Sequence, residues 1–190
     1  MEIISDKFLA EGIHFCIKNS EIFLDTAKTL LKQGYYRESY LLILYSLEEM
    51  GKIMMIGNYL FYTDSSERMT LWKKRFRDHG EKFWFSRDLD DIFNKIIPSE
   101  KNKDEEKKTI LKQNIAYVDF KKNKFVYPNK VTEKETRELI NKANKRISSL
   151  KDNHPSIEED EKNIRENFEE LKNMSFDDLK ERAIKNGFSI

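Results

Sequence analysis

The sequence predicts an all-α protein: an antiparallel helical bundle with a short hairpin or loop insertion near residues 117–130 and a C-terminal helical arm. Only 6 Gly and 3 Pro occur in 190 residues, and this scarcity of turn residues favours long helices over many short strands. Apolar residues recur at spacings of three and four, the pattern of one buried helix face. The length suits one core with an appendage, so residues 1–151 are predicted to form the bundle and residues 152–190 an acidic extension.

Two long helices are expected to come first. Residues 5–33 carry a single apolar stripe, and Gly34 is expected to end that helix. Residues 35–62 are apolar around most of the helical circumference, which predicts the central helix of the bundle. A third helix begins near residue 66 with Trp72, Phe76 and Phe83 on one side, and we expect an interruption near Gly80.

The second half of the chain is more polar. Residues 88–114 are predicted as a fourth helix, and residues 117–130 as a hairpin or extended loop, because β-branched and aromatic residues flank a Lys-Lys-Asn-Lys turn. Thr132 and Glu135 have the spacing of a capping box and begin a fifth helix that runs to about residue 150. Residues 152–155 are the predicted linker. Ser156 and Glu159 then begin the helical arm, which is expected to pack on the bundle or on a partner.

Composition and charge exclude several classes of protein. The 35 Lys and Arg nearly cancel the 34 Asp and Glu, so any contact with nucleic acid must come from a local cluster of charge. Cys16 is the only cysteine, which rules out a disulfide framework and a Cys-rich zinc site. No apolar run reaches the ~20 residues of a membrane span or resembles a signal peptide, and no phosphate-binding loop or metal motif occurs. We therefore expect a soluble cytoplasmic protein without a cofactor.

Three blocks of sequence resemble a known family. Residues 27–53, AKTLLKQGYYRESYLLILYSLEEMGKI, contain an Ala-x-x-Leu-Leu helix end, a Gly-aromatic turn and the run Glu-Glu-x-Gly-Lys. KKRFRDHGEKF is a basic and aromatic stretch that ends in His-x-x-Lys, and AYVDF, KFVYP and TEKETRELINKANKRI follow in turn. In this order the blocks resemble the AbiV abortive-infection proteins, a branch of the HEPN superfamily of helical RNases. One position departs from the pattern, since Lys112 stands where that family commonly has an Arg.

The resemblance implies a HEPN-like bundle that acts as a homodimer in phage defence, either as a metal-independent endoribonuclease or as a translation inhibitor. It also implies control by a protein partner or a phage-encoded trigger. HEPN nucleases typically carry an Arg, four to six residues, and then a His. The nearest versions here are Arg75 with His79, three residues between them, and Lys74 with His79, four residues between them. His79 is therefore the candidate acid and base.

Arg75, His79 and Lys82 fall on one face of the third helix, because steps of four and three residues separate them. Cleavage of RNA by its 2′-OH needs a base that works near neutral pH, an acid for the leaving oxygen, and cations for the charged phosphorane. One histidine cannot readily be base and acid at once. We therefore expect a two-fold dimer that gathers two His79 rings, with Arg75 and Lys82, around one phosphate. The alternative is a histidine packed at the edge of the apolar stripe.

The second helix offers supporting charges. Glu48 shares a face with Leu44 and is expected to point inward, where a buried carboxylate needs a partner. Lys52 and Arg37 are the predicted partners. Such a pair either holds the helices in register or positions the basic groups of the third helix. Glu49 lies about 100° further around the helix and is expected to be a surface charge or part of a dimer interface.

Basic side chains alternate with aromatic ones between residues 67 and 87, a pattern that single-stranded RNA binding uses and that a core face with a wet flank also produces. Arg77 is a candidate RNA contact in this stretch. Lys112, Tyr117 and Asp119 are expected to line the same groove. The competing hypothesis is a non-catalytic helical module that binds a protein in phage defence, in which His79 only packs.

Overall fold

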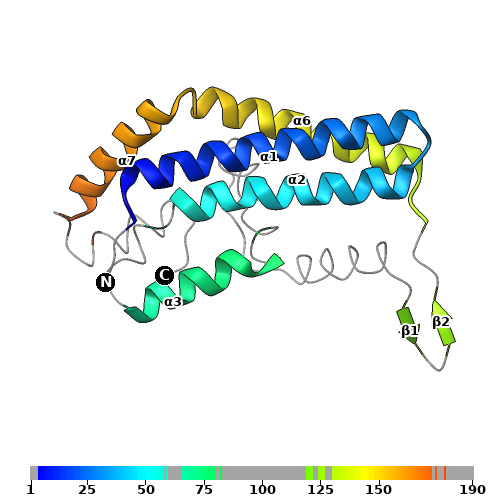
Figure 1. Cartoon of the computed structure of the whole chain (residues 1–190), viewed down its shortest axis with the longest axis horizontal. Helices are drawn as coiled ribbons and strands as arrows, with labels where there is room; N and C mark the ends of the chain where they lie inside the picture. Colours follow the sequence, from blue (N-terminus) through cyan, green and yellow to red (C-terminus); the bar gives the residue numbers. More distant parts are fainter. Residues whose placement is uncertain are drawn as a thin grey trace.

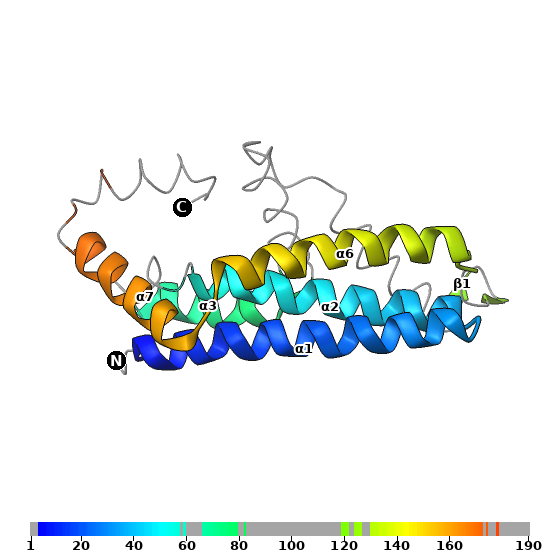
Figure 2. The ribbon, with the colours of Figure 1, turned by 90° about the horizontal axis from the view of Figure 1, so that it is seen from above.

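A computed structural model gives the fold, and the description covers residues 4–57, 59, 66–79, 82, 119–121, 124–126, 130–172, 174 and 178. Three long helices, α1 (Asp6–Lys32), α2 (Tyr36–Gly57) and α6 (Glu133–Asn153), run side by side and enclose the core (Figure 1). In the same view α2 lies between α1 and α3 (Ser66–Arg77). A further helix, α7 (Ile157–Lys172), packs against α1 (Figure 2). The predicted helical fold is confirmed.

Local signals in the sequence set the ends of α1. The Ser5 side chain accepts a hydrogen bond from the Phe8 backbone N–H at 3.3 Å, which satisfies one donor of the first turn. At the other end Gly34 has a φ of 83°, a conformation that residues with a Cβ rarely adopt, and the chain turns there into α2. Both predicted ends are confirmed. The second helix was predicted to reach residue 62, whereas α2 ends at Gly57, and of the residues between them the structure describes Tyr59.

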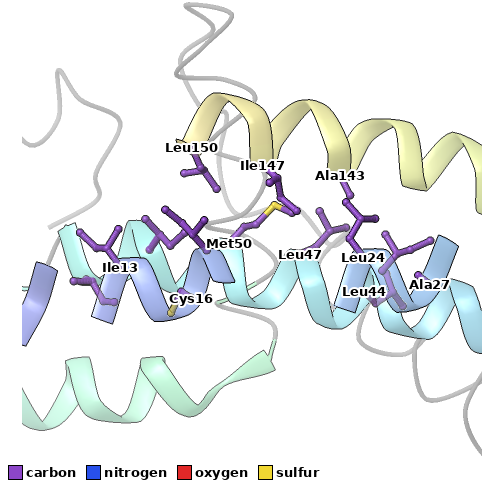
Figure 3. Close-up of a cluster of buried hydrophobic side chains, with 14 of the residues drawn as sticks. Ile13, Cys16, Leu24, Ala27, Leu44, Leu47, Met50, Ala143, Ile147 and Leu150 are labelled. Carbon is purple, nitrogen blue, oxygen red and sulfur yellow. The ribbon is translucent and has the colours of Figure 1, made fainter. Parts of the chain in front are cut away.

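The contact between α1 and α2 combines apolar side chains with buried hydroxyls. Leu24, Met50 and Leu150 are among the buried side chains that meet between α1, α2 and α6 (Figure 3). Ser20 Oγ donates to the Ser46 carbonyl at 3.2 Å, and Ser46 Oγ donates to the Ser20 carbonyl at 2.9 Å. Because a buried hydroxyl without a partner costs free energy, these reciprocal bonds favour one register of the two helices.

The capping box predicted for α6 is present. Thr132 Oγ1 accepts from the Glu135 backbone N–H at 3.2 Å, and the Glu135 carboxylate accepts from the Thr132 backbone N–H at 2.8 Å. The other end of α6 differs from the prediction, because the helix runs through Asn153, where a linker was expected. The Asn153 side chain donates to the Ser149 carbonyl at 2.7 Å and thereby supports the last turn. The linker is therefore only residues 154–156.

A buried carboxylate ties α7 to the bundle. Ser156 begins the helix as predicted, since its Oγ accepts from the Glu159 backbone N–H at 3.1 Å. One turn further on, the Asp160 carboxylate accepts from His14 Nε2 on α1 and from His154 Nδ1 in the linker, each at 2.9 Å. Asp160 is buried, and a buried charge is tolerated only when it is paired. The first helix of the predicted arm, α7, therefore packs on the bundle, which is one of the two positions predicted for it.

The predicted hairpin is confirmed as two short antiparallel strands, β1 (Asp119–Lys121) and β2 (Lys124–Val126), with Phe120 opposite Phe125. The predicted fourth helix, residues 88–114, lies outside the described residues. Within the part of the chain that the structure describes, none of the helices combines the length and the apolar character of a membrane-spanning segment.

Candidate functional site

A histidine and a buried carboxylate meet where α3 ends beside α2. His79 Nδ1 donates to Glu48 Oε2 at 2.6 Å, a contact between residues 31 positions apart in the sequence. Glu48 points inward, as predicted, but it is bonded to His79, whereas the two predicted partners bond to other carboxylates, Lys52 to Glu49 and Arg37 to Glu38. The carboxylate pairs with the third helix because a buried charge is stabilised by whichever cation or donor the tertiary packing brings to it.

The two groups differ sharply in exposure. The Glu48 side chain is 5% exposed, whereas the His79 side chain is 54% exposed. About half of the His79 ring is therefore open to solvent, and the choice between a packed and a functional histidine at the edge of the apolar stripe stays a prediction. Because Nδ1 is engaged with the carboxylate, Nε2 is the ring nitrogen left to meet a ligand. An imidazole held by a carboxylate on one nitrogen, with the other turned to solvent, is an arrangement suited to moving protons.

The neighbouring charges form a second pair next to the first. Lys52 Nζ donates to Glu49 Oε1 at 2.6 Å, so Lys52 pairs with Glu49 and not with Glu48 as predicted. The Glu49 side chain is only 14% exposed, so it is not the solvated surface charge that was one of its two predictions, and a place in a dimer interface stays a prediction. Its carboxylate lies against the Cys16 thiol on α1. Burial first, and then the charge of Glu49, raise the pKa of that thiol to about 12.

Gly51 lets the polypeptide after α3 approach α2. A Cβ built on Gly51 would lie 1.8 Å from the Lys82 carbonyl oxygen and 2.7 Å from its carbonyl carbon, so only glycine fits in this packing. This residue was not among the predicted site residues. The run Glu-Glu-x-Gly-Lys thus has a structural reading, in which Glu48 holds His79 and Gly51 admits the backbone three residues beyond it.

The Lys82 side chain is not on the surface, where a phosphate contact would need it. It is buried, and its Nζ donates to the Arg77 carbonyl at 3.3 Å. Carbonyls at the end of a helix lack intrahelical partners, and a cation there interacts favourably with the helix dipole. In this arrangement Lys82 supports the end of α3.

The rest of α3 divides into a buried and a basic side. Trp72 is buried and donates from Nε1 to the Met55 carbonyl at 2.9 Å, which fixes α3 along α2. Among the basic residues of its last turn, Lys74 and Arg77 are exposed and Arg75 is half-buried. Trp72 thus packs as the core-face reading of this stretch expects, and RNA binding by the solvated basic side stays a prediction. The candidate cations therefore lie in the turn that leads directly to His79.

Of the three remaining predicted residues the structure describes Asp119, which lies away from this site. Asp119 lies in the hairpin, which Figures 1 and 2 place at the end of the bundle where α6 begins, away from α3. Lys112 and Tyr117 lie outside the described residues. Among the residues that are described, no three His, Cys, Asp or Glu side chains are grouped as a metal site would require. The expected convergence of two His79 rings concerns a second copy of the chain and stays a prediction.

Comparison with known proteins bears on the family alone. Searches of curated proteins and of solved structures found no match to this chain. A family model, HEPN_AbiV, described as AbiV, matches residues 8–149, which include nearly all of α1, all of α2 and α3, and most of α6. The chain therefore belongs to the AbiV family of HEPN proteins.

Proposed function

We propose that this protein is a metal-independent endoribonuclease of abortive infection, which stops translation in the cytoplasm by cutting RNA. The observation that carries the proposal is the pair of a half-exposed His79 and a buried Glu48, 2.6 Å apart. A surface that only binds a protein has no need of a buried charge, whose desolvation opposes folding unless a partner offsets it. An imidazole with a fixed orientation needs such a carboxylate.

The proposed reaction uses two imidazoles, one from each subunit of a two-fold dimer. His79 Nε2 of one protomer takes the proton of a ribose 2′-OH as its oxygen forms a bond to the adjacent phosphorus. The bond from phosphorus to the 5′ oxygen breaks, and the imidazolium of the partner subunit's His79 gives its proton to that oxygen. The products are a 2′,3′-cyclic phosphate and a free 5′-OH. In each protomer Glu48 stabilises the ring while it is protonated.

The last turn of α3 supplies positive charge for the phosphate. Arg75 offers a planar group that can hold two phosphate oxygens, and Lys74 and Arg77 add exposed charge in the same turn. These groups stabilise the charge that develops on the phosphorane. Lys82 supports the segment and is not assigned a phosphate contact, because its Nζ is bonded to the Arg77 carbonyl.

A homodimer and an external control complete the proposal. An RNase active at all times would arrest its own cell, so we propose that a protein partner or a phage-encoded trigger releases the activity. Binding of RNA, dimerisation and control are separate steps, and each can be measured apart from cleavage.

Replacing Glu48 with glutamine tests the pair. Glutamine keeps an oxygen that accepts from Nδ1 but lacks the charge that stabilises an imidazolium, so we expect cleavage of total RNA from the expression host to slow by about 10²-fold. Glu49→Gln is the matched control. It removes an adjacent carboxylate that pairs with Lys52, and cleavage should stay within about twofold. Equal rates for the two variants, both folded by circular dichroism, would refute the role of Glu48.

A further inference from the structure

Two of the three histidines in the chain share one buried carboxylate, apart from the candidate site. Asp160 accepts from His14 Nε2 and from His154 Nδ1, each at 2.9 Å and on a different oxygen. The Asp160 side chain is 4% exposed and each imidazole 23%. The family model matches residues 8–149, so His154 and Asp160 lie beyond it. This cluster therefore belongs to the junction between the AbiV bundle and α7.

The contact between α7 and the bundle depends strongly on that cluster. Among the described residues of α7, Asp160 alone is buried, whereas Ile157, Ile164 and Phe168 are half-buried. Half-buried apolar side chains contribute less to docking than fully buried ones, because the contribution follows the area removed from water. A buried carboxylate, in contrast, opposes docking unless its partners offset the loss of water. The state of the two imidazoles therefore decides how firmly α7 is held.

The other charged groups around the cluster come from α1, from the end of α6 and from α7. Carboxylates ordinarily titrate near pH 4 and lysines and arginines above pH 10, whereas imidazoles do so between about pH 5 and 8. Arg165, for example, lies 3.7 Å from Asp6 and 2.6 Å from Glu161, and this contact should be alike at pH 6 and pH 8. The surrounding groups are Asp6, Glu11, Lys18 and Glu21 on α1, Lys151 and Asp152 on α6, and Glu161 and Arg165 on α7.

A proton on either ring changes what the Asp160 carboxylate is paired with. With both rings neutral, the carboxylate has two donors but no cation, and the three groups carry one net negative charge. One proton removes that net charge and turns a neutral donor into a cation. The gain exists only while α7 is docked, because a detached arm carries Asp160 into water. Docking therefore takes up protons, and by linkage it becomes stronger as the pH falls from 8 to 6.

We propose that His14, His154 and Asp160 form a proton-operated latch, which holds α7 on α1 at mildly acidic pH and loosens as the imidazoles lose their protons. Figure 2 shows α7 turning away from the end of α6 and lying beside the N-terminal part of α1, so its release uncovers that part of the bundle. The latch goes beyond the proposed function and uses none of its chemistry. The attachment of α7 and the cleavage of RNA are measured separately, so either proposal can fail alone.

Hydrogen exchange of the full chain, followed by mass spectrometry at pH 6 and pH 8, measures how often α7 detaches. A detached helix of 16 mostly polar residues is marginal by itself, so its amides exchange when it leaves the bundle. After correction for the intrinsic rate at each pH, we expect α7 to be about three- to tenfold better protected at pH 6. Amides of α6 are the internal reference and should change by less than about twofold. Equal protection of α7 at the two pH values overturns the proposal.

Amide replacements separate proton uptake from hydrogen bonding. His14→Gln and His154→Asn place an amide nitrogen where Nε2 and Nδ1 now bond to Asp160, so both donors stay but neither can take up a proton. In the double variant we expect α7 to be protected equally at both pH values, at about the level of the native chain at pH 8.

The His79→Asn variant is the matched control, because it removes the third histidine and should keep the full pH response of α7. A response that persists in the double variant, or one that His79→Asn abolishes, places the titrating group elsewhere and contradicts the latch. An α7 that is unprotected at both pH values in the double variant contradicts it as well, because both donors to Asp160 are retained.

Discussion

Replacing His79 with alanine is expected to abolish growth arrest and to slow RNA cleavage by about 10²- to 10⁴-fold, the contribution typical of a positioned acid and base. The half-exposed ring contributes little to the core, so the helical content should not change. Rates on total RNA, measured with the purified full chain, give the size of the effect. The growth of cells that express each variant shows whether growth arrest is lost.

The alanine variant also leaves the buried Glu48 carboxylate without its histidine, and that loss has a cost in stability of its own. His79→Asn separates the two effects, because an asparagine amide can still donate to Glu48 but cannot carry a proton. We expect this variant to fold like the native chain and to be as inactive as His79→Ala. Lys73→Ala, at an exposed position of α3, is the control that should keep full activity. If the His79→Asn variant folds, dimerises and still arrests growth, the catalytic role of His79 is refuted and the protein-binding hypothesis remains.

Gly51→Ala is expected to have the second large effect. The added Cβ would lie 1.8 Å from the Lys82 carbonyl oxygen, and the obstructing atoms belong to backbone, which cannot turn aside as a side chain can. Either α2 or the segment that follows α3 must move. We expect a loss of about 1–3 kcal/mol in the free energy of unfolding, as for overpacking elsewhere, together with loss of cleavage, because the displaced segment carries His79 away from Glu48.

Gly57→Ala is the matched control for that substitution. It lies at the end of the same helix, and a Cβ there meets no atom within 4 Å. Alanine restricts the unfolded chain more than glycine does, so this variant should be unchanged or more stable by up to about 1 kcal/mol. Urea unfolding followed by circular dichroism measures both variants. Equal unfolding midpoints for Gly51→Ala and Gly57→Ala would contradict the close approach of the Lys82 carbonyl to Gly51.

The sequence predicted the elements whose signals are local. Ser5 and Gly34 mark the two ends of α1, and Thr132 with Glu135 marks the start of α6, because a capping residue bonds to backbone within its own turn. The hairpin was likewise visible in a change of composition around a short turn. These features depend on a few consecutive residues, and no knowledge of the tertiary fold is needed to find them.

The partners of the charged residues were not predictable in the same way. A helical wheel offers only neighbours three or four residues away, so it assigned Lys52 to Glu48, whereas the fold brings in His79 from another helix. The two imidazoles around Asp160 come from α1 and from the linker before α7, and no sequence pattern connects them. Pairings of this kind follow from the packing of helices, which the sequence specifies only through the whole core.

The ends of the RNA fragments test the central claim most directly, which is that His79, held by Glu48, drives attack by the ribose 2′-OH. Total RNA would be incubated with the native chain in the presence of a metal chelator, and the fragment ends would be identified by mass spectrometry. The proposed mechanism predicts 2′,3′-cyclic phosphate and 5′-OH ends, no cut at a site whose ribose is replaced by 2′-deoxyribose, and none of these products with His79→Asn. Fragments with 3′-OH and 5′-phosphate ends, or cleavage that persists in His79→Asn, would contradict it.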